Sequence, residues 1–210
     1  MKQPNYEFEE AALGRGALRV AGVDEVGRGP LAGPVMAAAV ILDPANMPAG
    51  LNDSKKLTAK RREAMYDQIL ATAQVGFGEA SVQEIDEINI LQASHLAMVR
   101  AVNDLPQTAD YALIDGNLIP KALPIAAESI IKGDAKSVSI SAASIVAKVR
   151  RDSLMMALSQ QYPGYGWENN QGYPTQQHRD SIHRLGITPH HRRSFKPIHN
   201  ILYQAKNLTS

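Results

Sequence analysis

Residues 18–34 read LRVAGVDEVGRGPLAGP, and residues 35–42 continue as VMAAAVIL. The apolar run at 18–23 and the run at 35–42 are typical of buried strands, and the segment between them is rich in glycine and proline. Further strands are expected at residues 75–82, 111–114 and 125–131, and helices at residues 58–71, 91–103 and 141–160. Three strands in sequence, followed by strands that alternate with helices, predict an α/β domain built on one mixed sheet.

After residue 162 the sequence changes to Gly, Pro, His and Arg with few apolar runs. We therefore expect a catalytic core over residues 1–160 and a C-terminal appendage of short helices and loops over residues 161–210, packed on that core. A chain of 210 residues suits one domain with an appendage.

The composition excludes several classes of protein. The chain has no cysteine, so it has no disulfide scaffold, thiol nucleophile or Cys-ligated metal. The longest apolar stretch, residues 35–42, is too short to span a bilayer, and the first residues lack the apolar core of a signal peptide. We expect a soluble, cytoplasmic protein without a membrane segment.

A formal net charge of +1 conceals an uneven distribution of charge. Residues 71–134 carry three basic and nine acidic side chains, whereas residues 135–210 carry ten basic and three acidic ones. This pattern fits carboxylates near a metal followed by cations for a polyanion, and it equally fits two differently charged solvated faces.

Acidic residues recur where the expected strands end. Asp24 and Glu25 follow the first apolar run, Asp115 follows residues 111–114, and Asp134 lies just past the strand that precedes a long helix. Each could form a turn or cap a helix. Together, at the strand ends of one α/β sheet, they predict a site of hard oxygen ligands for Mg²⁺ or Mn²⁺.

The sharing of one site by Asp24 and Glu25 requires the strand to end or bend there, because neighbouring strand residues point to opposite faces. Gly27 and Gly29 allow such a bend. By contrast, the pair Glu9–Glu10 lies in a polar N-terminal segment, where no functional role is expected.

Four carboxylates around one point would repel one another without a metal. Two divalent ions about 4 Å apart would form a clamp for in-line phosphoryl displacement. The sequence contains no Gly-x-Ser-x-Gly elbow and no Gly-x4-Gly-Lys-Ser/Thr phosphate loop, which disfavours acyl transfer and nucleotide hydrolysis.

The segment AGVDEVGRGPLAGPV at residues 21–35 resembles the first motif of ribonuclease HII. The further matches, in order, are DSKKL at 53–57, IDG at 114–116, KGD at 132–134, SAASIVAKVRRD at 141–152, GYPT at 172–175 with His178, and HHRRSF at 190–195. The resemblance covers about residues 18–196, and its first motif is long and specific.

The resemblance implies an RNase H-like mixed five-stranded sheet flanked by helices. It implies a metal-dependent endoribonuclease that cuts the RNA strand of RNA–DNA hybrids and acts in ribonucleotide excision repair. Such an enzyme incises duplex DNA on the 5′ side of embedded ribonucleotides and leaves 3′-OH and 5′-phosphate ends. Carried over by motif, Asp24, Glu25, Asp115 and Asp134 would hold two Mn²⁺ or Mg²⁺ ions, with Asp24 bridging both.

The resemblance also implies substrate contacts. Backbone groups of Gly27, Arg28 and Gly29 would contact the ribose 2′-hydroxyl, which distinguishes RNA from DNA. Tyr173 would pack on the sugar on the DNA side of the junction. The residues expected to contact phosphates are Lys55, Lys56, Arg192 and Arg193. Without the resemblance, the glycines would suit a tight turn, Tyr173 a half-buried loop position, and the cations a solvated surface.

Two features stand apart from the family pattern or from metal chemistry. Family members often have a lysine or arginine where this chain has Gln171, so one possible phosphate contact is missing. The histidines at positions 178, 183, 190 and 191 lack metal-like spacing, so we interpret them as polar surface or substrate-side residues rather than a zinc site.

Two other functions remain open. Another two-metal nuclease of this fold would act on all-DNA ends, and a non-catalytic hybrid-binding protein would lack at least one of the four acids. We expect a monomer, and residues 202–210 could bind a protein partner or simply fray.

Overall fold

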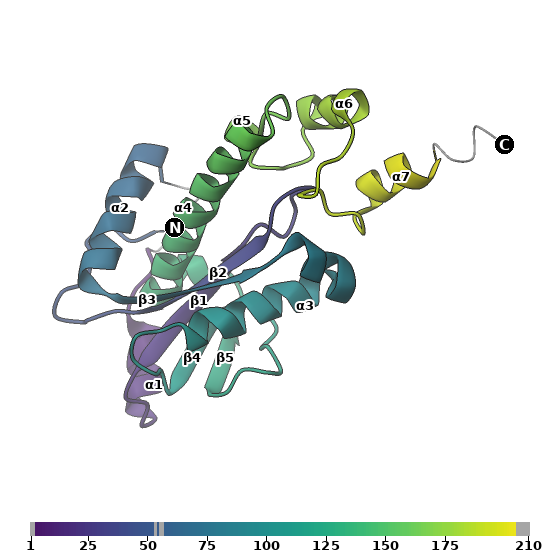
Figure 1. Cartoon of the computed structure of the whole chain (residues 1–210). Helices are drawn as coiled ribbons and strands as arrows, with labels where there is room; N and C mark the ends of the chain where they lie inside the picture. The colour runs from purple at the N-terminus through teal and green to yellow at the C-terminus, as the bar shows by residue number, and fades with distance from the viewer. Residues whose placement is uncertain (1–2, 53, 55–56, 205–210) are drawn as a thin grey trace. The chain divides into compact units, whose positions relative to one another are not determined.

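The computed structural model describes residues 3–52, 54 and 57–204 (Figure 1). The helices are α1 (Glu7–Gly14), α2 (Ala59–Thr72), α3 (Val82–Asn103), α4 (Val138–Gln161), α5 (Trp167–Asn170), α6 (Gln176–Leu185) and α7 (Lys196–Gln204), with a 3-10 turn, η2, at Gly133–Ala135. The strands are β1 (Val20–Val26), β2 (Val35–Ile41), β3 (Gln74–Ala80), β4 (Tyr111–Asp115) and β5 (Ala126–Ile130).

The strands form a five-stranded sheet in the order β3-β2-β1-β4-β5. β1 pairs antiparallel with β2 and parallel with β4, and β4 pairs parallel with β5. The predicted mixed five-stranded sheet flanked by helices is therefore confirmed. β1 runs further than the apolar run suggested, because Val26 still pairs with Met36 of β2.

The described chain divides into two compact units. The sheet unit comprises Met1–Val26, Met36–Glu79 and Ser94–Val149, and the loop unit comprises Gly27–Val35, Ala80–Ala93 and Arg150–Ser210. Residues 150–160, which we assigned to the core, group with the C-terminal segments in this division. The boundary at residue 160 stays a prediction.

In the sheet unit, α2 and α4 pack against one face of the sheet, and the second half of α3 packs against β3 (Figure 1). The cluster under α2 and α4 joins Ala38 and Val40 of β2 to Met65 and Ile69 of α2. Thr58 caps α2, because its hydroxyl accepts the N–H of Arg61. This packing holds β2, the strand that pairs with the acid-bearing β1, against the helices.

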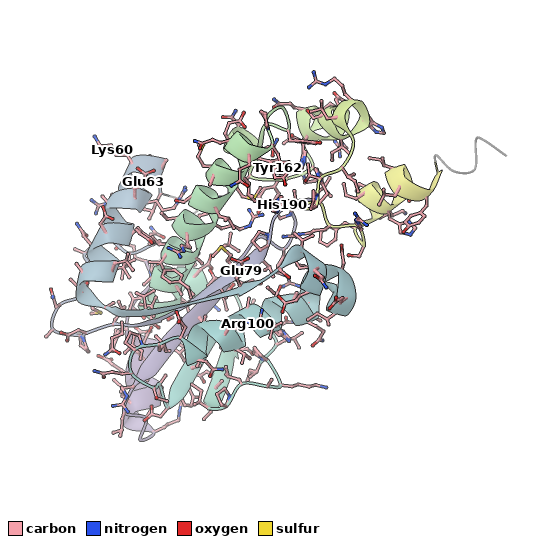
Figure 2. The ribbon with its side chains drawn as sticks, viewed as in Figure 1. Lys60, Glu63, Glu79, Arg100, Tyr162 and His190 are labelled. Carbon is pink, nitrogen blue, oxygen red and sulfur yellow. The ribbon has the colours of Figure 1, made fainter. Side chains whose placement is uncertain are left out.

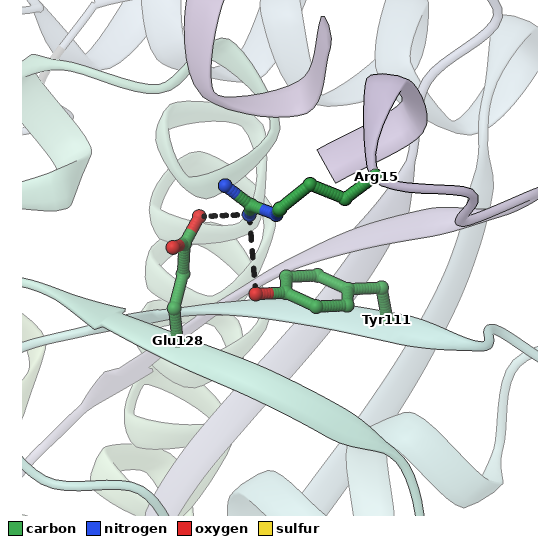
Figure 3. Close-up of polar contacts among 3 residues, drawn as sticks. All are labelled: Arg15, Tyr111 and Glu128. Carbon is green, nitrogen blue, oxygen red and sulfur yellow. Dashed lines mark hydrogen bonds and ion pairs between the residues drawn. The ribbon is translucent and has the colours of Figure 1, made fainter. Parts of the chain in front are cut away.

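Helix α1 was not expected from the sequence. Beyond its end, Arg15 donates to Glu128 at 3.1 Å and to the hydroxyl of Tyr111 at 3.2 Å, so α1 is tied to β4 and β5 (Figure 3). Glu9, which we placed in a polar segment, is fully buried. Its Oε1 accepts hydrogen bonds from Ser137 and Ser139 at the start of α4.

In the loop unit, an apolar cluster forms around Trp167, which is fully buried with Met155, Ile182 and Ile198. The unit also contains the first half of α3, which a kink at Asn89 separates from the second half. Within the described residues, none of the helices has both the length and the apolar character needed to cross a bilayer.

Candidate active site

The sheet unit brings three of the four predicted acids together. Val23 of β1 pairs with Ile114 of β4 in parallel register, so the next residues along, Asp24 and Asp115, lie side by side. Oxygens of Asp24, Glu25 and Asp115 lie within 4.8 Å of one another. We expected the strand formed by residues 18–23 to end or bend at the two acids, and both acids lie inside the last three residues of β1.

A hydrogen bond joins the end of β4 to the turn that carries the fourth acid. The N–H of Gly133 donates to Oδ1 of Asp115 at 2.7 Å, and the N–H of Gly116 donates to the carbonyl of Ile130 at 3.1 Å. Asp134 follows directly in η2, and its negative charge contributes to the raised pKa of Asp24. Asp134 therefore lies close enough to act electrostatically on Asp24, and its place as a fourth ligand stays a prediction.

Asp24 is 6% exposed, and its pKa is raised well above the usual value of 3.8. The largest cause is burial, followed by the negative charges of Glu25 and Asp115, while a hydrogen bond from Ser144 opposes the shift. A buried carboxylate in repulsive contact with two others is stabilised by a cation. Oxygen donors at this spacing suit Mg²⁺ or Mn²⁺, so the residues fit a divalent metal site.

The loop unit holds the predicted substrate residues that follow β1. Arg28 and Gly29 are exposed, and Gly27 is buried with a φ of 94°. Tyr173 lies against this turn, since a Cβ built on Gly29 would lie 3.4 Å from its Cε1. Tyr173 is 43% exposed, so the turn and this residue present one surface to solvent.

The predicted phosphate contacts fall into three groups. Arg192 is fully buried and donates to backbone carbonyls, so its surroundings differ from those of a surface phosphate contact. Arg193 is exposed, and its backbone N–H is held by Asp86 at 3.0 Å. Lys55 and Lys56 lie outside the described residues.

Two of the histidines are buried, which excludes a place on the polar surface for them, and the alternative of a substrate-side role stays a prediction. The indole N–H of Trp167 donates to Nε2 of His178 at 2.9 Å, so His178 carries its proton on Nδ1, which donates to the carbonyl of Tyr173. His191 accepts the N–H of Thr188 at Nδ1, and its Nε2 lies 3.2 Å from Nε2 of His178. This network supports the backbone of Tyr173.

The other two histidines differ in their surroundings. His183 is exposed, and His190 packs edge-on against Tyr162, with 5.1 Å between ring centroids (Figure 2). Sequence reasoning missed Arg151 and Glu9. Arg151 falls inside the quoted SAASIVAKVRRD segment, which offered the only sequence signal for it.

Comparison with known proteins places the chain in a family. The family model of ribonuclease HII matches residues 21–198. The ribonuclease HII of Ruegeria pomeroyi is 65% identical over 97% of this chain and 87% of its own length, and that of Paracoccus denitrificans is 57% identical over the full length of both.

Solved structures agree with the fold. The ribonuclease H2 of Pyrococcus horikoshii has a TM-score of 0.75 and 28% identity over 90% of this chain and 99% of its own. Bst-RNase HIII, solved in complex with Mn²⁺, has a TM-score of 0.74 over 94% of this chain and 73% of its own, and at 20% identity it supports the fold alone. The acid cluster, the RNase H fold and these matches show that the chain belongs to the ribonuclease HII family of endonucleolytic ribonucleases H.

Proposed function

We propose that this protein incises duplex DNA on the 5′ side of an embedded ribonucleotide and also cuts the RNA strand of RNA–DNA hybrids. Water would attack the phosphorus, and the 3′ oxygen would leave, so the products carry 3′-OH and 5′-phosphate ends. The observation that supports this proposal most strongly is the group of carboxylate oxygens of Asp24, Glu25 and Asp115 within 4.8 Å of one another.

Asp24, Glu25, Asp115 and Asp134 would hold two divalent ions, Mn²⁺ or Mg²⁺. Bound there, the ions would lower the pKa of the attacking water and stabilise the leaving oxygen. The chain's own part is to hold the acids in place. Ser144 donates to Asp24, and the N–H of Gly133 orients Asp115 next to Asp134.

The loop unit would recognise the sugars of the substrate. Backbone groups of Gly27, Arg28 and Gly29 would contact the 2′-hydroxyl, and the exposed ring of Tyr173 beside Gly29 would pack on the neighbouring deoxyribose. Arg193 would contact a phosphate, as would Lys55 and Lys56. Arg192 is buried, so we do not assign it a phosphate contact.

This activity would start ribonucleotide excision repair, since it leaves a 3′-OH end on the deoxynucleotide that precedes the ribonucleotide. A non-catalytic hybrid-binding protein would lack one of the acids, and this chain has all four. The monomeric state, the cytoplasmic location and a partner-binding tail at residues 202–210 stay predictions.

The experiment uses a DNA duplex that carries one ribonucleotide, an RNA–DNA hybrid and an all-DNA duplex, each with Mg²⁺ or Mn²⁺. We expect incision of the first on the 5′ side of the ribonucleotide, cleavage of the second and no cleavage of the third. Absence of incision at the ribonucleotide would overturn the proposal. Cleavage of all-DNA ends would instead identify another two-metal nuclease.

A further inference from the structure

Two arginines of the loop unit have buried side chains. Arg151, on α4, and Arg192, which follows His191, are both 0% exposed. Desolvating a guanidinium is costly unless its N–H groups find acceptors. Both side chains find them in the same short segment, residues 27–34, which directly follows β1.

Arg192 holds the first residues of this segment. Its Nη2 donates to the carbonyl of Gly27 at 2.5 Å, its Nη1 to that of Arg28 at 3.0 Å, and its Nε to that of Gly33 at 2.9 Å. The backbone N–H of Arg192 also donates to the carbonyl of Leu31 at 2.8 Å. Arg192 thus holds both ends of residues 27–34, which we call the glycine turn.

Arg151 holds the C-terminal end of this segment and also the loop that contains Gln171. Its Nε donates to the carbonyl of Pro34 at 3.0 Å, and its Nη2 donates to that of Ala32 at 3.1 Å. Its Nη1 donates to the carbonyl of Gln171, two residues before Tyr173, at 3.0 Å. Arg151 therefore connects the glycine turn to the chain that carries Tyr173.

The packing of Arg151 also explains why residue 27 is a glycine. A Cβ on Gly27 would lie 2.2 Å from Nε of Arg151 and 2.9 Å from the carbonyl oxygen of Pro34. Any side chain there would displace the guanidinium. Gly27 and Arg151 thus form one packed arrangement.

The direction of the carbonyls determines the direction of the neighbouring N–H groups. In a planar trans peptide, the N–H of one residue points opposite to the C=O of the residue before it. The carbonyls of Gly27 and Arg28 point to the buried Arg192, so the N–H groups of Arg28 and Gly29 point away from it. Both residues are exposed.

We propose that Arg151 and Arg192 are positioning residues that set ribonucleotide specificity. They turn the carbonyls of the glycine turn inward, so that its N–H groups face the sugar of the substrate. This inference rests on the proposed function, because it explains how the turn recognises the ribose. It assigns Arg192 to the loop and not to a phosphate.

Two neighbouring cations behind the turn also favour an anionic substrate. Burial lowers the pKa of Arg192 to about 9, with a further contribution from the positive charge of Arg151. Burial likewise lowers the pKa of Arg151 to about 10. Both side chains stay cationic at neutral pH, and a phosphate near the turn would offset their mutual repulsion.

The test measures binding in a catalytically inactive Asp24→Asn background. The parent should bind a duplex with one ribonucleotide more tightly than an all-DNA duplex. Arg192→Lys and Arg151→Lys keep the charge but lose the planar fork. We expect each substitution to reduce this preference by about tenfold or more, because hydrogen bonds between the charged guanidinium and the turn are lost. The affinity for all-DNA duplex should stay unchanged.

The matched control is Arg184→Lys, at an exposed arginine near the end of α6, which should leave the preference unchanged. Circular dichroism would confirm that each variant is folded. A folded Arg192→Lys and a folded Arg151→Lys that both keep the full ribonucleotide preference would overturn the inference. A parent without any preference would refute the proposed function itself, so the two failures are distinguishable.

A second measurement needs no change to either arginine. In the Asp24→Asn protein, the amide resonances of Arg28 and Gly29 should shift more with the ribonucleotide duplex than with the all-DNA duplex. Equal shifts with both duplexes would contradict the inference even if the lysine variants failed to fold.

Discussion

Glu9 and Ser139 are hydrogen-bonded across 130 residues of sequence. The backbone N–H of Ser139 donates to Oε1 of Glu9 at 2.9 Å, and the Ser139 hydroxyl donates to the same oxygen. The Ser137 hydroxyl does so as well. Helix α1 thereby holds the start of α4, shortly after Asp134 of the proposed metal site.

We predict that Glu9→Ala lowers the free energy of unfolding by about 2 kcal/mol, because it leaves the buried serine donors of α4 without their acceptor. Chemical denaturation measures this change. The matched control is Glu10→Ala at the adjacent, exposed acid, where we expect a change within about 0.5 kcal/mol. Equal effects of the two substitutions would show that the Glu9 contacts contribute little.

The sequence could not distinguish Glu9 from Glu10, because burial of a carboxylate depends on partners far along the chain. Arg192 and Arg193 show the same limit: one is fully buried and the other exposed. The acceptors of Arg192 lie up to 165 residues away. Adjacent residues of one type have the same local pattern and differ only in tertiary contacts.

The strands and the acid cluster were predictable because they depend on local patterns. Apolar runs located all five strands, and acids beside those runs located Asp24 and Asp115. The end of β1 was not predictable, since it depends on pairing with β2, where Val26 lies opposite Met36. Pairing partners are chosen by the tertiary fold.

The repulsion within the acid cluster leads to a second prediction. Asp24→Asn should lower turnover on the ribonucleotide duplex roughly a thousandfold, because it weakens metal-assisted stabilisation of charge. Substrate binding should largely survive, since the proposed substrate contacts lie elsewhere. Near-normal cleavage would refute the metal role of Asp24.

Asp24→Asn should lower turnover but raise the stability of the metal-free protein. In EDTA we expect its melting temperature to exceed that of the wild type by roughly 2–4 °C, since a buried charge repelled by Glu25 and Asp115 is removed. Mn²⁺ should stabilise the wild type more than the variant. Asp67→Asn, at an exposed acid of α2, is the control and should change neither quantity.

The contact between β1 and α4 carries a third prediction. A Cβ on Gly22 would lie 2.1 Å from the backbone carbon of Ser139 and 2.2 Å from the N of Ile140. Because backbone atoms cannot move aside as a flexible side chain can, Gly22→Ala should cost about 3 kcal/mol or more of unfolding free energy.

The control for Gly22→Ala is Gly14→Ala at the end of α1, where an added Cβ meets nothing within 4 Å. Alanine there should be neutral or stabilise by about 0.5 kcal/mol, because it restricts the unfolded chain. Thermal and urea denaturation of both variants provide the comparison. A stable Gly22→Ala protein would contradict the close approach of α4 to β1.

The buried histidines of the loop unit give the last prediction, which concerns pH. Burial, with the charge of His178 as a smaller cause, lowers the pKa of His191 from 6.5 to about 3. Below pH 6.5 the unfolded chain binds a proton that the folded chain does not. The contribution of neutral His191 to the free energy of unfolding is therefore fully present above pH 6.5 and is lost progressively as the pH falls toward 3.

Between pH 7 and pH 5, His191 should account for about 2 kcal/mol of lost stability. His191→Asn, whose side-chain oxygen can replace Nδ1 as acceptor for the N–H of Thr188, should be less stable at pH 7 but should show a smaller decrease on acidification. Urea denaturation at both pH values measures the difference. His183→Gln, at an exposed histidine, should keep the wild-type pH dependence. If His191→Asn also kept it, the neutral His178–His191 pair would not be what makes this unit sensitive to acid.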